Sequence, residues 1–357
     1  MISFHPTQTR AWIRGIDPYS PKSLLELWPA EATQFEFLRR EVADGSILAK
    51  RGIPTAYPLT CFFLLAPLAW LPWPVANAVW AALNVAMFAS MIWALISLTD
   101  LGRNRKRTYA FVICALALAP FHTGIATANI AVLAIELSVI AMWTARKRYD
   151  VVTGILLAIA IGLKPQIGLC FLAYYFFRRR WSIFGTAPFF IVAIGAVAAL
   201  RLQLSHVTWI NNYVSDNQAL FGTGILSDFK AENATRFGLI NLQLIIYSLA
   251  GPSAPANIVA FAIAGFMFAG FVWLLRGNNE NGAGLLPIST IAVLSLLPIY
   301  HRFYDAALLI LPLCWYLAGR RDQQTSARAA GITSHIPVFL ARGIVARSIA
   351  GSRAHSV

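Results

Sequence analysis

The chain has 357 residues, of which 58% are hydrophobic and 12% are charged, and its mean hydropathy is +0.63. A soluble domain averages about 25% charged residues, so this composition excludes an ordinary soluble protein and predicts a membrane protein with several spans. The net charge of +14 comes largely from short basic clusters between apolar segments, at 102–107, 146–148, 178–180 and 319–321. This pattern is typical of cytoplasmic loops and not of a nucleic-acid groove, so no nucleic-acid partner is expected.

The first part of the chain is polar. Residues 1–57 carry charges of both signs and predict a segment outside the bilayer. The following stretch, 58–73, is apolar but contains Pro67 and Pro72, and it is short for a hydrocarbon core of about 30 Å. It predicts a re-entrant or interfacial helix.

Apolar segments recur along the rest of the chain and predict an all-α integral membrane domain over 58–320. A polar loop is expected at 201–256, with a membrane-parallel helix at 238–251, and a basic tail at 321–357. The predicted helices are 75–98, 109–121, 128–145, 151–163, 166–177, 182–200, 257–275, 285–299 and 304–319.

The basic clusters predict the orientation of these helices. If every cluster is cytoplasmic, residues 1–57 and 201–256 lie outside and the C-terminal tail lies inside. Segments 151–163 and 166–177 then form a hairpin between two inside loops, with arms of only about 18 Å each. We expect the Lys164-Pro165 bend at its tip to stop within the membrane and line a cavity. Since residues 1–57 lie outside without an apolar helix before them, we also expect a transmembrane helix upstream of the recorded start.

Few ionisable side chains fall inside the apolar segments, and they are the candidate site residues. A charge at the bilayer centre costs about 2.5 to 3.5 kcal/mol, so such residues usually face a cavity or a binding site. Lys164 precedes the proline bend, where its ammonium can contact a phosphate or cap the broken helix. Glu136 and Asn129 are candidates for a polar cavity lining; the alternatives are a packed glutamate bonded to a neighbouring helix and, for Asn129, an interfacial cap beside a short external turn.

Three more candidates lie close together in the segment YHRFYDAALL. His301 and Arg302 are four and three residues before Asp305, so on a helix all three share a face. The predicted topology places them at the external mouth of the last helix pair. Asp305 is expected to pair with Arg302 or His301 and to line a polar cavity, while the two cations are candidates for binding a phosphate.

Four sequence blocks follow one another along the chain: RAWIRGIDPYSP (10–21), AYPLTCFFLLAPLAWLPWPVANAVWAALN (56–84), GILLAIAIGLKPQIGLCFLAYYFFRRRW (154–181) and YHRFYDAALLILPL (300–313). In this order they are similar to successive blocks of bacterial glycosyltransferase family 87, and the resemblance extends to about residue 320. It implies a GT-C-like bundle in the bacterial plasma membrane that moves a hexose, often mannose, from a polyprenyl-phosphate carrier to an external glycolipid or glycan acceptor. Lys164, His301 and Arg302 would bind the donor phosphate; no cofactor or metal is expected.

The chain departs from the family pattern at the catalytic carboxylate. In the relatives that the resemblance implies, an Asp lies a dozen or so residues before the Gly-x-Asp-Pro-Tyr block, where this chain has Ser3. The first acidic residue is Asp17, inside that block, so the catalytic base is left unassigned. Two other classes therefore stay open: a lipid or solute transporter or flippase, and a catalytically inactive membrane scaffold.

Overall fold

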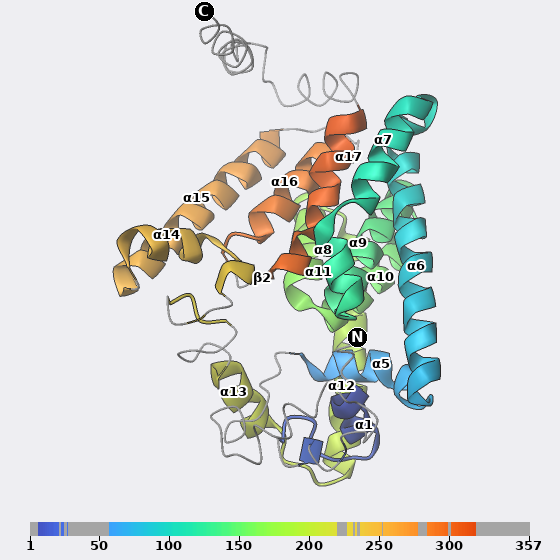
Figure 1. The fold of residues 1–357 in the computed structure, drawn as a ribbon, viewed down its shortest axis with the longest axis vertical. Coiled ribbons are helices and arrows are strands. Elements are labelled where there is room, and N and C mark those ends of the chain that lie inside the picture. The colour runs from blue at the N-terminus through green and yellow to red at the C-terminus, as the bar shows by residue number, and fades with distance from the viewer. Residues whose placement is uncertain are drawn as a thin grey trace, which may run out of the picture.

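The computed structural model describes residues 6–20, 23–24, 27, 57–219, 227–230, 233, 236–251, 253–277, 284–298 and 301–318. Helices dominate these residues and confirm the predicted all-α membrane fold (Figure 1). Within the described ranges the β-structure consists of β1 (Leu239–Ile240) paired with β2 (His301–Arg302). Most of the predicted segment 1–57, including Ser3, and the tail 321–357 lie outside the described residues.

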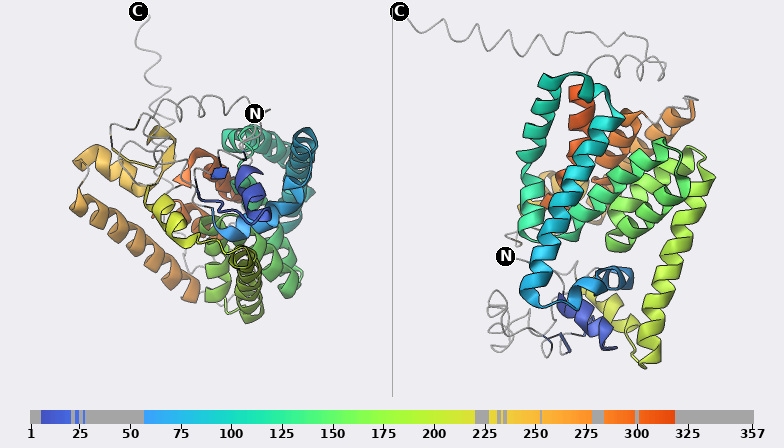
Figure 2. Two further views of the ribbon diagram at one scale, coloured as in Figure 1. Left: turned by 90° about the horizontal axis from the view of Figure 1, so that it is seen from below. Right: turned by 90° about the vertical axis from the view of Figure 1, so that its right-hand side faces the viewer.

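Among the described residues, three helices are long and apolar enough to cross a membrane: α6 (Trp73–Leu98), α12 (Trp181–Leu204) and α15 (Ala254–Gly277). They correspond to the predicted spans 75–98, 182–200 and 257–275. Figure 2 shows α6 and α12 running along the long axis of the molecule on opposite sides of the bundle.

The predicted span 109–121 is wrong as a single helix. It consists of α7 (Arg105–Leu116) and α8 (Ala119–Ala126), which are bent by 45° and together form a possible fourth span. The break falls just before Pro120, which has no N–H to donate and whose ring clashes with the preceding turn of a continuous helix.

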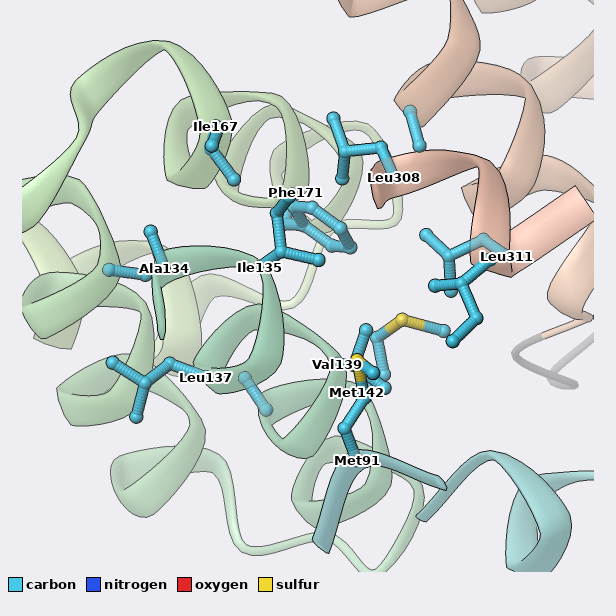
Figure 3. Close-up of a cluster of buried hydrophobic side chains, with 14 of the residues drawn as sticks. Met91, Ala134, Ile135, Leu137, Val139, Met142, Ile167, Phe171, Leu308 and Leu311 are labelled. Atoms are coloured by element: carbon cyan, nitrogen blue, oxygen red, sulfur yellow. The ribbon is translucent and has the colours of Figure 1, made fainter. Parts of the chain in front are cut away.

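Shorter helices fill the centre of the bundle: α9 (Ile130–Arg146), α10 (Asp150–Leu163), α11 (Pro165–Phe177), α16 (Leu285–Ser295) and α17 (Ile310–Ala318). Helix α9 lies at the core, where its side chains contact several neighbours. Figure 3 shows Ile135 beside Phe171 of α11, and Met142 between Met91 of α6 and Leu311 of α17. The predicted span 304–319 is again interrupted, because a 3₁₀ helix, η4 (Phe303–Leu309), precedes α17.

Three basic clusters lie within the described residues, at 102–107, 146–148 and 178–180, and they gather at one end of the bundle. Their arginines bond to the last carbonyls of neighbouring helices, which otherwise lack partners. The three bonds, at 3.2 to 3.3 Å, run from Arg107 to Ala318, from Arg146 to Leu98 and from Arg180 to Ala145. Arg180 also forms an ion pair with Asp150.

The opposite end is closed by what we term the α1–α5 layer, made of α1 (Pro6–Ile13), residues 14–20 and α5 (Leu59–Ala69). The indole N–H of Trp12 donates to the Ala198 carbonyl of α12 at 2.9 Å, which fastens the layer to the bundle. Helix α5 lies across the direction of α6 (Figure 1), in agreement with the predicted short helix at 58–73. The predicted loop 201–256 contains two further helices, α13 (Ile210–Ala219) and α14 (Leu242–Ala250).

The α1–α5 layer packs closely against the end of α12 at a single glycine, Gly15. Gly15 has φ +67°, and a Cβ at this position would lie 2.1 Å from the Ser205 hydroxyl oxygen. Gly185, in α12, has no such neighbour within 4 Å.

Gly15→Ala should therefore destabilise the protein by about 1 to 3 kcal/mol, because a left-handed backbone and a steric clash act together. Gly185→Ala is the matched control and should be neutral or stabilising by up to about 1 kcal/mol, since alanine favours a helix interior. Thermal unfolding of both variants in detergent measures the difference. Equal midpoints would contradict this account of Gly15.

Candidate functional site

The site is built around a break between two helices. Helix α10 ends at Leu163 and α11 begins at Pro165, so Lys164 lies alone in extended backbone at φ −146° and ψ 92°. Proline disfavours a helical conformation in the residue before it, and the local sequence therefore dictates the break. The Lys164 N–H still donates to the Ala160 carbonyl at 2.8 Å, which closes the last turn of α10.

Lys164 forms a buried ion pair with a residue 141 positions later in the chain. Its Nζ lies 2.5 Å from Oδ1 of Asp305, and the two side chains are only 6% and 1% exposed. The other carboxylate oxygen, Oδ2, accepts from the Arg302 N–H at 3.0 Å and lies 3.1 Å from Nδ1 of His301. Both oxygens of the carboxylate are thus engaged. We refer to Lys164, His301 and Asp305 as the Lys164 cluster.

The imidazole of His301 is fully buried and held at both nitrogens. Nε2 lies 3.1 Å from the Ser295 carbonyl oxygen, while Nδ1 faces Asp305. A carbonyl and a carboxylate both accept hydrogen bonds, so a ring protonated on both nitrogens satisfies both contacts. The ammonium of Lys164 also lies 4.6 Å from the centre of the Tyr304 ring, a favourable cation–π geometry.

A short strand pair positions the histidine. Ile240 pairs with His301 and Leu239 with Arg302, and the Leu242 N–H donates to the Leu297 carbonyl at 2.9 Å. The segment that leads into α14 therefore fixes the backbone of β2. η4 begins directly after β2 and turns Asp305 back toward His301.

The expectation that residues 301, 302 and 305 share a helix face is wrong, because the first two lie in extended backbone. Asp305 does contact His301, one of the two partners expected from the sequence. Its ion pair with Lys164 was not anticipated, since neither local spacing nor composition relates two residues so far apart. Arg302 is half-buried, and its charge lies close enough to act on Lys164. The Asp305 carboxylate therefore contacts Lys164 and His301 directly, and the charge of Arg302 lies close to Lys164.

Asn129 and Glu136 lie on α9, which packs against η4, and among the described residues no hydrogen bond or ion pair joins either of them to the Lys164 cluster. Asn129 caps α9, since its side-chain oxygen accepts from the Ala131 N–H at 3.0 Å, which fits the capping alternative. Glu136 is fully buried, and among the described residues neither of its carboxyl oxygens has a hydrogen-bond partner. Asn84 on the adjacent α6 was missed by sequence reasoning; its side-chain oxygen is likewise buried without a partner in the described ranges.

Asp17 offers a second described carboxylate in the polar N-terminal block. Its oxygens accept from the Tyr19 N–H at 2.9 Å and from the Asn212 side chain at 2.6 Å. Burial raises its pKa above the usual aspartate value, although these two hydrogen bonds act in the opposite direction. Asp17 belongs to the α1–α5 layer, and no described contact links it to Lys164.

Within the described ranges, no group of three His, Cys, Asp or Glu side chains lies close enough together to hold a metal ion.

The fold and the site define a helical membrane protein with a buried, cation-rich cluster at a broken helix. A model of glycosyltransferase family 87 matches residues 55–299, more than half of the chain, and the protein belongs to this family. It is therefore a membrane glycosyltransferase, which requires a sugar donor and an acceptor. A search of curated proteins and a search of solved structures each gave no significant match. The matched region includes Lys164 and ends just before His301.

The buried ion pair predicts an asymmetric response to substitution. Lys164→Met leaves a buried carboxylate without its cation and should cost about 3 to 5 kcal/mol of stability. Lys164→Met combined with Asp305→Asn removes both charges and should recover much of that loss. Arg103→Met is the control, because it breaks an exposed ion pair with Asp100 that is worth at most about 1 kcal/mol.

Unfolding midpoints of the purified variants in detergent measure these costs. A double variant as unstable as Lys164→Met, or a single variant as stable as the parent, would show that the pair does not control stability.

Glu136→Gln should keep or raise the thermal midpoint and leave sugar transfer unchanged. Glutamine has nearly the same shape as the glutamic acid side chain and carries no charge, so it adds no cost at a position where no described group pairs with the carboxyl. A large loss of transfer at unchanged stability would instead place Glu136 in the working site.

Proposed function

We propose that the protein is a hexosyltransferase of GT-C architecture that moves a sugar from a polyprenyl-phosphate carrier to a glycolipid or glycan acceptor. Family membership supplies the reaction class. The observation that carries the finer proposal is the Lys164 cluster, because a lipid-phosphate leaving group calls for cations at membrane depth. Lys164 and the nearby Arg302 place two cationic side chains at this site, and cations stabilise the negative charge of a phosphate leaving group.

The transfer places clear demands on these residues. The acceptor hydroxyl oxygen bonds to the anomeric carbon as the bond from that carbon to the phosphate oxygen breaks. The electron pair of the broken bond stays on the phosphate, where Lys164 and Arg302 stabilise the added negative charge. His301 contributes positive charge when both nitrogens are protonated and holds Asp305, which in turn orients the Lys164 ammonium.

The acceptor proton requires a general base. Asp305 is not our candidate for it, because both of its oxygens already accept hydrogen bonds within the cluster. Asp17 is engaged in the α1–α5 layer. The base is therefore left unassigned among the described residues.

The exposed apolar surface of α14 supports a lipid-linked donor. Helix α14 follows β1, the strand that pairs with β2, and its Ile245 and Leu249 are 55% and 83% exposed. An exposed apolar surface therefore lies next to the strand that pairs with His301, and a polyprenyl chain could bind there.

We place the reaction on the external face of the bacterial plasma membrane. The three basic clusters within the described residues gather at the end of the bundle away from the α1–α5 layer, and basic loops favour the cytoplasmic side. In this orientation the N-terminal segment and 201–256 are external, and the C-terminus is cytoplasmic.

The proposal is tested with the full chain and polyprenyl-phosphate-linked mannose or glucose as donor, over a panel of glycolipid acceptors. Transfer of radiolabelled sugar from one of these donors is the expected result. Absence of transfer from both donors would contradict the proposal, and gradient-driven uptake in proteoliposomes would indicate a transporter instead.

Arg302→Ala should raise the KM for the donor by about 10-fold or more, because a charge-assisted hydrogen bond to phosphate is worth about 1.5 to 3 kcal/mol. Lys147→Ala is the matched control: it removes one cation from the opposite, basic end of the bundle and should leave the KM unchanged. Folded yield is measured by size-exclusion chromatography. A loss of yield for Arg302→Ala that accounts for its whole loss of activity would point to a structural role.

A further inference from the structure

A second cationic site lies where α1 meets the corner between α5 and α6. The cavity there has a volume of about 400 Å³, and its lining includes Arg10, Arg14, Trp70, Leu71 and Pro72. None of these residues belongs to the Lys164 cluster. We term this cavity the Arg10–Arg14 pocket.

The two arginines offer unused hydrogen-bond donors to the pocket. Arg10 donates from Nε to the Ala69 carbonyl at 3.2 Å and from Nη2 to the Leu71 carbonyl at 3.3 Å. A guanidinium has five N–H donors, so three remain while these two bonds hold the group in place. Arg14 follows one turn later and is exposed. Among the described residues, neither arginine forms an ion pair with a carboxylate.

The surroundings of the pocket match the interface of a membrane. Trp70 is 76% exposed, and tryptophan concentrates where the lipid headgroups meet the hydrocarbon core. Directly beyond the pocket, α6 begins its long apolar span, and Val75 and Val79 are 47% and 41% exposed on its first turns. A ligand with a phosphate at the arginines would therefore have apolar surface beside it for acyl chains.

From this geometry we infer that the Arg10–Arg14 pocket binds the phosphodiester headgroup of an anionic phospholipid. Arginine is suited to this task because its planar guanidinium can donate two parallel hydrogen bonds to phosphate oxygens. Arg10 is held in place by α5, and Arg14 adds a second charge on the side open to solvent. The exposed apolar start of α6 favours a lipid over a free anion. This inference does not depend on the proposed sugar transfer.

Helix α5 connects the pocket with the Lys164 cluster. Ala69, near its C-terminal end, accepts from Arg10, while the Thr60 hydroxyl, near its N-terminal end, donates at 2.8 Å to the carbonyl of Gly162. Gly162 is two residues before Lys164. A lipid bound at the pocket therefore stabilises the α1–α5 layer that lies against the broken helix.

The test uses the full chain, purified in detergent and depleted of lipid, with short-chain phosphatidylglycerol, phosphatidylcholine or inorganic phosphate as the added probe. Thermal shift and native mass spectrometry report binding. Phosphatidylglycerol should raise the unfolding midpoint and form a 1:1 complex, whereas phosphatidylcholine should do neither. Arg14→Ala should weaken phosphatidylglycerol binding about 10-fold. Arg103→Ala removes the same charge at the opposite end and should leave binding unchanged.

Several outcomes would overturn the inference. If phosphatidylglycerol and phosphatidylcholine raise the unfolding midpoint equally, headgroup charge does not determine binding. If inorganic phosphate raises the midpoint as much as phosphatidylglycerol, the pocket is a site for a free anion. Equal loss in Arg14→Ala and Arg103→Ala would indicate diffuse electrostatics. If Arg14→Ala is poorly folded, Arg14→Gln and Arg14→Lys replace it; lysine should retain more binding than glutamine, and equal binding by these two variants would also contradict the inference.

Discussion

The ion pair between Lys164 and Asp305 is the constraint on which the arrangement of the bundle depends. A charge buried without a partner is strongly destabilising, so the helix break that contains Lys164 must lie against the segment that supplies Asp305. The pair thereby joins the α10–α11 hairpin to the η4–α17 region, 141 residues away. A hydrogen bond from the Arg302 backbone N–H and a contact with His301 complete the surroundings of the carboxylate.

Short helices make room for this pair at membrane depth. Helices α10 and α11 have 14 and 13 residues, or about 20 Å each, which is less than the hydrocarbon thickness of about 30 Å. Their broken junction exposes irregular backbone, which a membrane tolerates only where protein or a water-filled cavity surrounds it. The α1–α5 layer supplies part of that protein, since Thr60 bonds directly to Gly162. The shortness of the two arms thus places Lys164 inside the bundle, where Asp305 pairs with it.

Much of this fold follows from local sequence. The long apolar runs predicted α6, α12 and α15, and Lys164 before Pro165 predicted the break because proline restricts the residue before it. The site was predicted less completely. Each cluster residue stood out as an ionisable side chain in apolar surroundings, yet nothing local pairs Lys164 with Asp305. The apolar run around His301 has no strand signal, and its extended backbone depends on pairing with Ile240, a contact made only in the folded chain.

The central claim is that the Lys164 cluster receives the donor phosphate. The most direct measurement is a cryo-electron microscopy structure of the full chain in lipid nanodiscs with a polyprenyl-phosphate-linked hexose. The account predicts phosphate density within hydrogen-bond distance of the Lys164 ammonium and the Arg302 guanidinium, with Asp305 still in contact with His301. Phosphate density elsewhere, beside an unchanged and solvent-free Lys164–Asp305 pair, would contradict it and leave the cluster with a structural role alone.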